Sequence, residues 1–510
     1  MAQYKTPGVY VVEENAFPTS VVEVETAVPA FIGYTERAAR GNKDLTKIPT
    51  RISSLAEFHL YFGYAPKTIF KKKAAADTAD RKKGATGADS PQPASAGPAG
   101  YEADAQTRFL LYYSMRLFFD NGGGPCWVTS LDSYQNAGAN RKADDFIAAI
   151  QHLEKEQEPT MVVTPDAVLL PQPDWAKVAF QAIEHCKKTM SRIAILDVCD
   201  GDKVRTRDAD DVVDKFRDQI TNDLPSYGVA YYPWVNTSIV EDGDINFSFL
   251  DKDSWGDFQK DLKKNLGDSF KPIGELIGKL TADSVTTTTE PNTVRLHQAL
   301  MVASPEYREV MADLKAQLNL LPPSAGIAGV YTRTDNTFGV FKAPANTGMA
   351  SVVSPAVNIT HDEQQDLNVP LNGKAVNAIR TFPGRGVLIW GARTLDGNSQ
   401  DWRYINVRRT LIMLEQSVKN AAQAYVFAPN NAATWTTVSN TIGNFLTNKW
   451  KEGALVGATP AEAFSVDVGL GSTMTANDIL DGYMLVTVKV ALVRPAEFIV
   501  ITFQQKMQTS

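Results

Sequence analysis

Cysteine and histidine are scarce in this chain of 510 residues. The three cysteines, Cys126, Cys186 and Cys199, form no CxxC pair, and the five histidines form no HExxH motif. A small secreted domain held by disulfides and the common zinc-binding motifs are therefore excluded. His185 and Cys186 with Cys199 offer soft ligands, but this pattern is more typical of a helix packed on a strand. The cysteines indicate a reducing compartment.

Long apolar runs and an excess of positive charge are also missing. No stretch of about 18 apolar residues occurs, so no membrane-spanning helix is predicted, and the N-terminal residues lack the apolar core and cleavage site of a signal peptide. The 51 Lys and Arg are outnumbered by 58 Asp and Glu, which gives a net charge of -7. This balance argues against a dedicated nucleic-acid binder. We expect no nucleic acid partner, no membrane insertion, and assembly in a cytoplasm.

Motifs that carry catalytic or nucleotide chemistry are absent as well. The segment Gly122–Gly124 follows a predicted helix and precedes a predicted strand, whereas a phosphate loop follows a strand and opens a helix. The segment Gly469–Thr473 lacks the lysine and the helix of a Walker loop, and no GxSxG motif occurs. We predict no catalytic residue, no cofactor and no metal site, and therefore no enzyme.

Between residues 104 and 236 the sequence alternates helical apolar spacing with short β-branched runs, which is the pattern of βαβ units. The predicted helices are 104–120, 143–156, 174–190 and 211–221, and the predicted strands are 126–131, 161–164, 193–198 and 227–232. This order predicts a mainly parallel sheet flanked by helices. A Rossmann-like enzyme with an unrecognised small-molecule site in this region is the alternative to a structural protein.

The remaining segments differ in composition and in predicted secondary structure. Residues 65–105 have low complexity and predict an exposed insertion, and the Asp-, Lys- and Thr-rich residues 240–292 predict a peripheral decoration. The C-terminal third predicts helices at 403–424 and 434–452, then strands at 483–493 and 497–503. A strand-prone segment at the chain end is an aggregation hazard unless something pairs with it.

The motifs along the chain resemble those of the sheath proteins of contractile phage tails, pyocins and related injection systems. The resemblance rests on the segments 6–13, 24–33, 118–128, 321–335, 342–346, 377–395 and 402–409. Its most specific part contains the core motif residues Pro383, Gly384, Gly386, Trp390, Gly391, Arg393, Arg408 and Arg409. One departure is Ala428, where many relatives carry glutamate.

The resemblance implies an α/β fold in which an α+β sheath core, built from N- and C-terminal segments, carries an inserted Rossmann-like region, surface decorations and extended terminal β-arms. The expected organisation is an N-terminal arm (1–24), the start of the core (25–64), the exposed insertion (65–105), a middle α/β wall domain (106–355), a C-terminal domain facing the tube (356–493) and a C-terminal arm (494–510).

The resemblance also implies a mechanical function. A contractile sheath polymerises helically around an inner tube, contracts from a metastable extended state and drives the tube through a target envelope. The implied partners are further copies of the chain, the inner tube protein, baseplate and terminal cap proteins, and paralogous sheath subunits. The particle would assemble in the cytoplasm and become part of a phage tail or a released extracellular injection particle.

Two sets of contact residues follow from the resemblance. The arms are expected to exchange strands between subunits through Val9, Tyr10, Val11, Val12, Phe498, Ile499, Val500 and Ile501. The helix at 434–452 is expected to contact the tube through Lys449 and Lys451, although cations in the last turn also suit the helix C-terminus without any partner.

Overall fold

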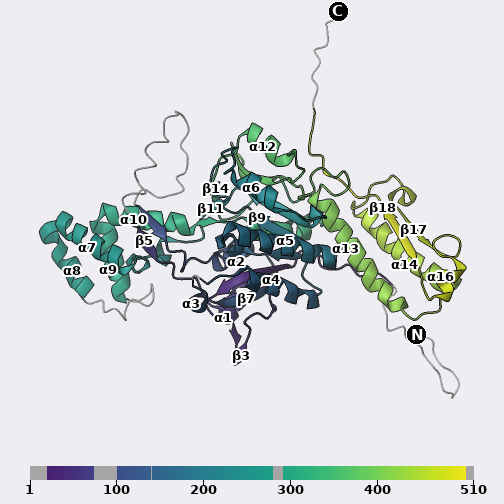
Figure 1. Cartoon of the computed structure of the whole chain (residues 1–510), viewed down its shortest axis with the longest axis horizontal. Helices are drawn as coiled ribbons and strands as arrows, with labels where there is room; N and C mark the ends of the chain where they lie inside the picture. The colour runs from purple at the N-terminus through teal and green to yellow at the C-terminus, as the bar shows by residue number, and fades with distance from the viewer. Residues whose placement is uncertain (1–19, 74–99, 139, 279–290, 501–510) are drawn as a thin grey trace, which may run out of the picture. The chain divides into compact units, whose positions relative to one another are not determined.

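The structure, a computed structural model, describes residues 20–73, 100–138, 140–278 and 291–500 (Figure 1). The chain divides into two compact units, Glu25–Arg409 and a second unit made of Met1–Val24 with Thr410–Ser510.

The larger unit is organised around one mixed sheet. Within the described residues it has nine strands, in the spatial order β13 (Thr347–Gly348), β16 (Gly386–Trp390), β15 (Asn377–Phe382), β10 (Gly228–Tyr232), β9 (Ile193–Asp197), β8 (Met161–Val163), β1 (Pro29–Thr35), β7 (Cys126–Ser133) and β4 (Thr50–Ile52). The run from β15 to β7 is parallel, and β4, β16 and β13 are antiparallel. The predicted α/β class and the mainly parallel sheet are confirmed.

Helices cover this sheet in two pairs. The helices α4 (Ala143–His152) and α5 (Gln172–Thr189) pack together and contact β1, β7 and β9, while α2 (Leu111–Asp120) and α11 (Ser324–Phe338) pack together and contact β1, β8 and β9. Every residue of β1, β8, β9 and β10 is buried. Burial on both faces explains why these strands read as continuous apolar runs rather than as alternating ones.

The predicted βαβ elements agree with the structure except at one helix start. The prediction of a helix over 104–120 is too long, because α2 begins only at Leu111. No side chain of its own segment caps α2. Instead the carboxylate of Asp166 accepts the backbone N–H groups of Leu110 and Leu111, and this distant cap fixes where the helix begins.

Shorter elements complete the larger unit. Outside the 240–318 region, the other described helices that lie wholly in this unit are α1 (Leu55–Phe62), α3 (Tyr134–Ala137), α6 (Val212–Gln219) and α12 (His361–Asn368). The 3-10 turns there are η2 (Leu153–Lys155), η3 (Pro165–Leu169) and η4 (Pro225–Tyr227). A small sheet has the order β12 (Leu320–Leu321), β11 (Val235–Thr237), β14 (Val352–Pro355), and two further pairs are β2 (Ala39–Arg40) with β3 (Lys43–Asp44) and β5 (Phe70–Lys72) with β6 (Tyr101–Ala103).

The two predicted insertions have more structure than their composition indicates. The strands β5 and β6 lie near the two ends of the 65–105 segment, and Phe70 and Tyr101 are buried; residues 74–99 lie outside the described residues. The 240–292 decoration is helical and continues beyond its predicted end. Its elements are η5 (Asp242–Asp244), η6 (Phe247–Phe249), α7 (Lys252–Leu266), η7 (Gly267–Phe270), α8 (Lys271–Gly278), α9 (Pro291–Ala303) and α10 (Pro305–Leu318).

The smaller unit contains both helices that were predicted near the C-terminus. Its elements are most of α13 (Ile405–Ala422), η8 (Gln423–Tyr425), α14 (Ala432–Lys451), α15 (Pro460–Ala463), β17 (Phe464–Val468), α16 (Ala476–Leu480) and β18 (Val486–Val490). The strands β17 and β18 form an antiparallel pair, and α14 packs on β17. In β18 the valines are half-buried and Thr487 and Lys489 are exposed, as the sequence alternation predicts.

The predicted domain boundary at 355/356 differs from the structure. Residues 356–409 belong to the larger unit, because β15 pairs with β10 and β16 pairs with β15. The segment that carries the core motif therefore completes the large sheet rather than beginning the C-terminal unit.

Candidate functional site

The core motif begins in the tight hairpin between β15 and β16. Gly384 and Gly386 have φ of 71° and 76°, a left-handed backbone that glycine adopts without strain. Beside the turn, the rings of Phe382 and Trp390 lie 4.5 Å apart, and the guanidinium of Arg385 lies 5.8 Å from the Trp390 ring centre. The turn itself, including Pro383, is exposed, so this end of the hairpin is available for contact.

At the other end of the hairpin, Asn377 joins three segments, a role that sequence reasoning missed. Its side-chain amide donates to the carbonyls of Ala230 and Arg393, at 3.1 and 2.7 Å, and its Oδ1 accepts the Arg393 N–H at 2.8 Å. A Cβ on Gly391 would lie 2.7 Å from that Oδ1. Gly391 is therefore required by the close approach of Asn377 rather than by a ligand.

The motif arginines Arg393 and Arg408 are buried inside the larger unit. The Arg393 guanidinium donates to the carbonyls of Asn368 and Gly397. The Arg408 guanidinium lies 3.8 Å from the ring centre of Trp402 and 4.5 Å from that of Tyr227. A planar cation between aromatic faces is a favourable arrangement.

The third arginine, Arg409, forms a buried ion pair with Asp335. The guanidinium donates to both carboxylate oxygens of Asp335, at 3.0 and 2.6 Å, and to the carbonyl of Thr26 at 3.0 Å. The two side chains are only 4% and 3% exposed. Because the larger unit begins at residue 25 and ends at residue 409, this pair fastens both of its chain ends.

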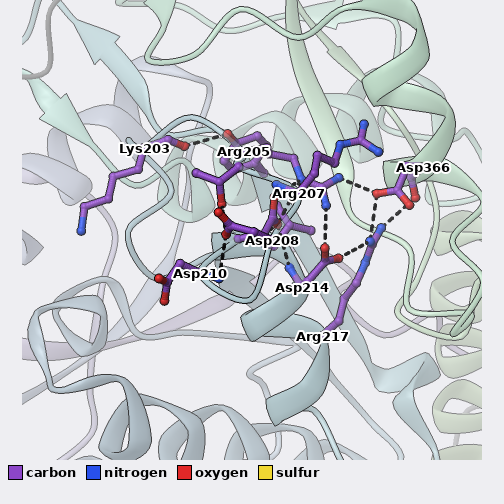
Figure 2. Close-up of polar contacts among 12 residues, drawn as sticks. Lys203, Arg205, Arg207, Asp208, Asp210, Asp214, Arg217 and Asp366 are labelled. Carbon is purple, nitrogen blue, oxygen red and sulfur yellow. Dashed lines mark hydrogen bonds and ion pairs between the residues drawn. The ribbon is translucent and has the colours of Figure 1, made fainter. Parts of the chain in front are cut away.

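A second cluster of charges joins α6 to α12 (Figure 2). The guanidinium groups of Arg205 and Arg217 both donate to the carboxylate of Asp366, and both also pair with Asp214. Arg205 further pairs with the fully buried Asp211 at 3.1 Å. Burial alone would raise the pKa of Asp211, but the hydrogen bonds from Arg205 and from backbone N–H groups lower it to about 2. Each arginine is paired with carboxylates, so the cluster has a structural role and holds α6 and α12 together.

At the carboxyl ends of the parallel strands, where α/β enzymes bind ligands, two buried aspartates meet helix N-termini. Asp166 accepts the N–H groups of Leu110 and Leu111 at α2, and Asp197 accepts the N–H and hydroxyl of Ser324 at α11. Burial raises the pKa of Asp166, and it raises the pKa of Asp197 to about 7. The chain's own carboxylates thus take the position that a ligand phosphate would need.

The two lysines predicted to contact a tube differ in their surroundings. The Lys449 ammonium is 8% exposed and lies 2.6 Å from carboxylate oxygens of both Glu23 and Glu452. Lys451 is exposed at the end of α14. Along the same helix, the other exposed side chains include the uncharged Thr436, Asn440, Asn444 and Asn448. Tube contact by these lysines stays a prediction.

The predicted strand arms are only partly described. Phe498, Ile499 and Val500 are 71%, 78% and 89% exposed and lie in no strand of the single chain. Val9, Tyr10, Val11, Val12 and Ile501 lie outside the described residues.

No group of three or more His, Cys, Asp or Glu side chains suited to a metal ion occurs in the described part of the chain. Within that same part, the helices are all too short or too polar to cross a membrane.

Comparison with known proteins identifies the C-terminal region first. The family described as phage tail sheath C-terminal domain matches residues 398–506. The tail sheath protein of Salmonella phage ViI is 27% identical over 141 residues, and that of Enterobacteria phage T4 is 27% identical over 114 residues. These stretches span 27% and 22% of this chain but only 22% and 17% of the phage proteins.

Solved structures extend the likeness to the whole chain. The helical sheath of the anti-feeding prophage in its contracted state matches with a TM-score of 0.60 and 26% identity, over 99% of this chain and 100% of that chain. This chain is therefore similar to contractile sheath subunits along nearly all of its length. The sheath of an extracellular contractile injection system, PVC, has the same fold, with a TM-score of 0.59 and 24% identity over 99% of each chain.

In this chain, packing explains the core motif. Gly384, Gly386 and Gly391 satisfy backbone geometry, and Arg393, Arg408 and Arg409 are held by partners within the larger unit. None of these side chains needs a substrate to account for its position.

Proposed function

We propose that this chain is the repeating subunit of a contractile sheath, which polymerises helically around an inner tube and contracts to drive that tube through a target envelope. The observation that carries the proposal is the match along 99% of the chain to the helical sheath subunit of the anti-feeding prophage. The described fold gives a second support, because β17 and β18 form a sheet of only two strands among the described residues.

The incomplete sheet is the pair β17 and β18 in the smaller unit. Among the described residues these strands pair only with each other, so the outer edge of each has no partner strand there and could pair with another chain. We propose that terminal arms of other copies add to these edges, with Phe498, Ile499, Val500 and Ile501 in one arm and Val9, Tyr10, Val11 and Val12 in the other. Strand addition supplies affinity through main-chain hydrogen bonds, and contacts that do not close build a helix.

The proposed mechanism is a change of packing. An extended sheath would be a trapped state of higher free energy, and rigid-body movement of one ring would favour the next. The arms would keep subunits connected while the other interfaces change. The free energy would come from interfaces formed on contraction, so no nucleotide and no enzymatic activity are required.

The alternative, a Rossmann-like enzyme with a site in residues 104–236, is less well supported. The strand ends where such a site belongs hold Asp166 and Asp197, and both are buried against helix N-termini. A Cβ on Gly33, at the end of β1, would lie 2.5 Å from the Asp166 carboxylate. Little room is left there for a ligand.

The remaining partners follow from the sheath function. The exposed face of α14, with its uncharged side chains and Lys451, is the proposed contact with the inner tube, and baseplate, cap and paralogous sheath proteins would bind the ends of the assembly. Assembly would take place in the cytoplasm, before the chain becomes part of a tail or a released particle.

Electron microscopy of the purified full-length chain tests this proposal. A sheath subunit should form hollow tubes with a helical surface, alone or with a co-expressed inner tube protein. A chain that stays monomeric in every condition and binds a nucleotide would contradict the sheath function and favour the enzyme.

A further inference from the structure

The N-terminal segment is fastened to the smaller unit just before the chain enters the larger one. The backbone N–H of Val24 donates to the hydroxyl of the fully buried Ser417 at 3.0 Å. The Glu23 carboxylate accepts from the Lys449 ammonium at 2.6 Å, and the side chain of Val21 is buried. Three contacts within four residues therefore hold this segment on the smaller unit.

Lys449 is the least expected member of this attachment. Its ammonium is 8% exposed, and a buried charge is costly unless it is paired. Burial alone would lower the pKa of Lys449, but its hydrogen bonds to Glu23 and Glu452 raise it. The residue is therefore a charged lysine held between the N-terminal segment and the end of α14, and its ammonium is already used within its own unit.

We propose that Lys449 is a positioning residue that holds residues 21–24, the root of the N-terminal arm, in a fixed position on the smaller unit. The inference rests on the proposed sheath function, in which this arm pairs with another copy. If the root is held in place, the arm samples fewer positions before it pairs with another copy. Less conformational entropy is then lost on assembly. Lys451 is the exposed cation at the end of α14.

A matched pair of variants tests the anchor. Glu23 and Glu452 accept from the same ammonium at the same distance, 2.6 Å, and their side chains are 43% and 50% exposed. Glu23→Gln and Glu452→Gln therefore remove equivalent charges, but only Glu23 belongs to the segment that leads to the arm. Both variants should fold, and their thermal unfolding midpoints should be similar.

The decisive readout is the protein concentration at which tubes first appear by light scattering and electron microscopy. We expect Glu23→Gln to raise this concentration about fivefold, the effect of weakening one charged hydrogen bond at the root of each arm. We expect Glu452→Gln to leave it unchanged. Equal effects of the two variants, or no effect of either, in a chain whose wild type forms tubes would overturn the anchor alone. A wild-type chain that forms no tubes would overturn the proposed function and the anchor with it.

Discussion

The two sheets of this molecule differ in how completely the chain itself buries and pairs them. In the larger unit, every residue of β1, β8, β9 and β10 is buried, and each of these strands has a partner on both sides. In the smaller unit, β17 is half-buried throughout, β18 alternates between half-buried and exposed, and each has one partner among the described residues. A two-stranded sheet is marginal on its own, so the larger sheet is the more self-sufficient of the two.

Removal of an arm should have the largest effect, and it should act on assembly alone. Deletion of residues 496–510 takes away exposed apolar side chains, including Phe498 and Val500, and leaves both sheets intact. We expect a folded subunit with an unchanged circular dichroism spectrum and no tubes by electron microscopy, and the same result for deletion of residues 1–14. Tubes of normal length from either truncated chain would refute strand exchange.

Disruption of the buried pair in the larger unit should act on stability. Arg409→Met leaves the carboxylate of Asp335, which is 3% exposed, without its guanidinium partner. A broken buried ion pair costs about 3 to 5 kcal/mol, and urea denaturation would measure it. The double variant Arg409→Met with Asp335→Leu should recover most of the loss, since no buried charge remains. A single variant as stable as the wild type would show that the pair does not fasten the ends of this unit.

The pH dependence of the larger unit should reveal Asp197. Its pKa of about 7 in the folded chain lies above the ordinary value of 3.8, so the folded state holds a proton that the unfolded state releases. Stability should therefore fall as the pH rises from about 4 to 7 and then level off. Asp197→Asn cannot lose that proton, and relative to wild type it should gain up to about 4 kcal/mol between pH 4 and pH 8. Urea midpoints with the same pH dependence in both chains would contradict this assignment.

An exposed ion pair on the small sheet should have the smallest effect. Lys489 and Asp467 are 73% and 42% exposed and lie 3.8 Å apart, and such pairs contribute less than about 1 kcal/mol. Lys489→Gln should change the unfolding midpoint in urea hardly at all, in contrast to Arg409→Met. A loss of unfolding free energy as large as that caused by Arg409→Met would contradict the proposed difference between the two sheets.

The sequence predicted the large sheet well because its strands are buried on both faces and separated by amphipathic helices. The prediction from sequence was wrong where residues far apart in the chain determine the local structure. The start of α2 depends on Asp166, more than fifty positions along the chain, and Gly391 depends on Asn377. The helices of the 240–292 decoration were missed because its polar composition hides the apolar spacing of Trp255, Phe258 and Leu262.

The candidate contact residues were harder to predict than the fold. A lysine in the last turn of a helix suits the helix dipole, a partner or a nearby carboxylate equally well, so sequence could not show that Lys449 pairs with Glu23. The motif arginines are similarly ambiguous, because Arg408 and Arg409 are adjacent in sequence and have different partners, aromatic rings for one and a carboxylate for the other.

A density map of assembled tubes at a resolution that separates strands is the most direct test of strand exchange. Strand exchange predicts that the pair β17 and β18 is extended in the tube by strands from residues 8–13 and 497–503 of other copies. A tube in which β17 and β18 remain a two-stranded sheet, with both arms folded on their own subunit, would contradict it.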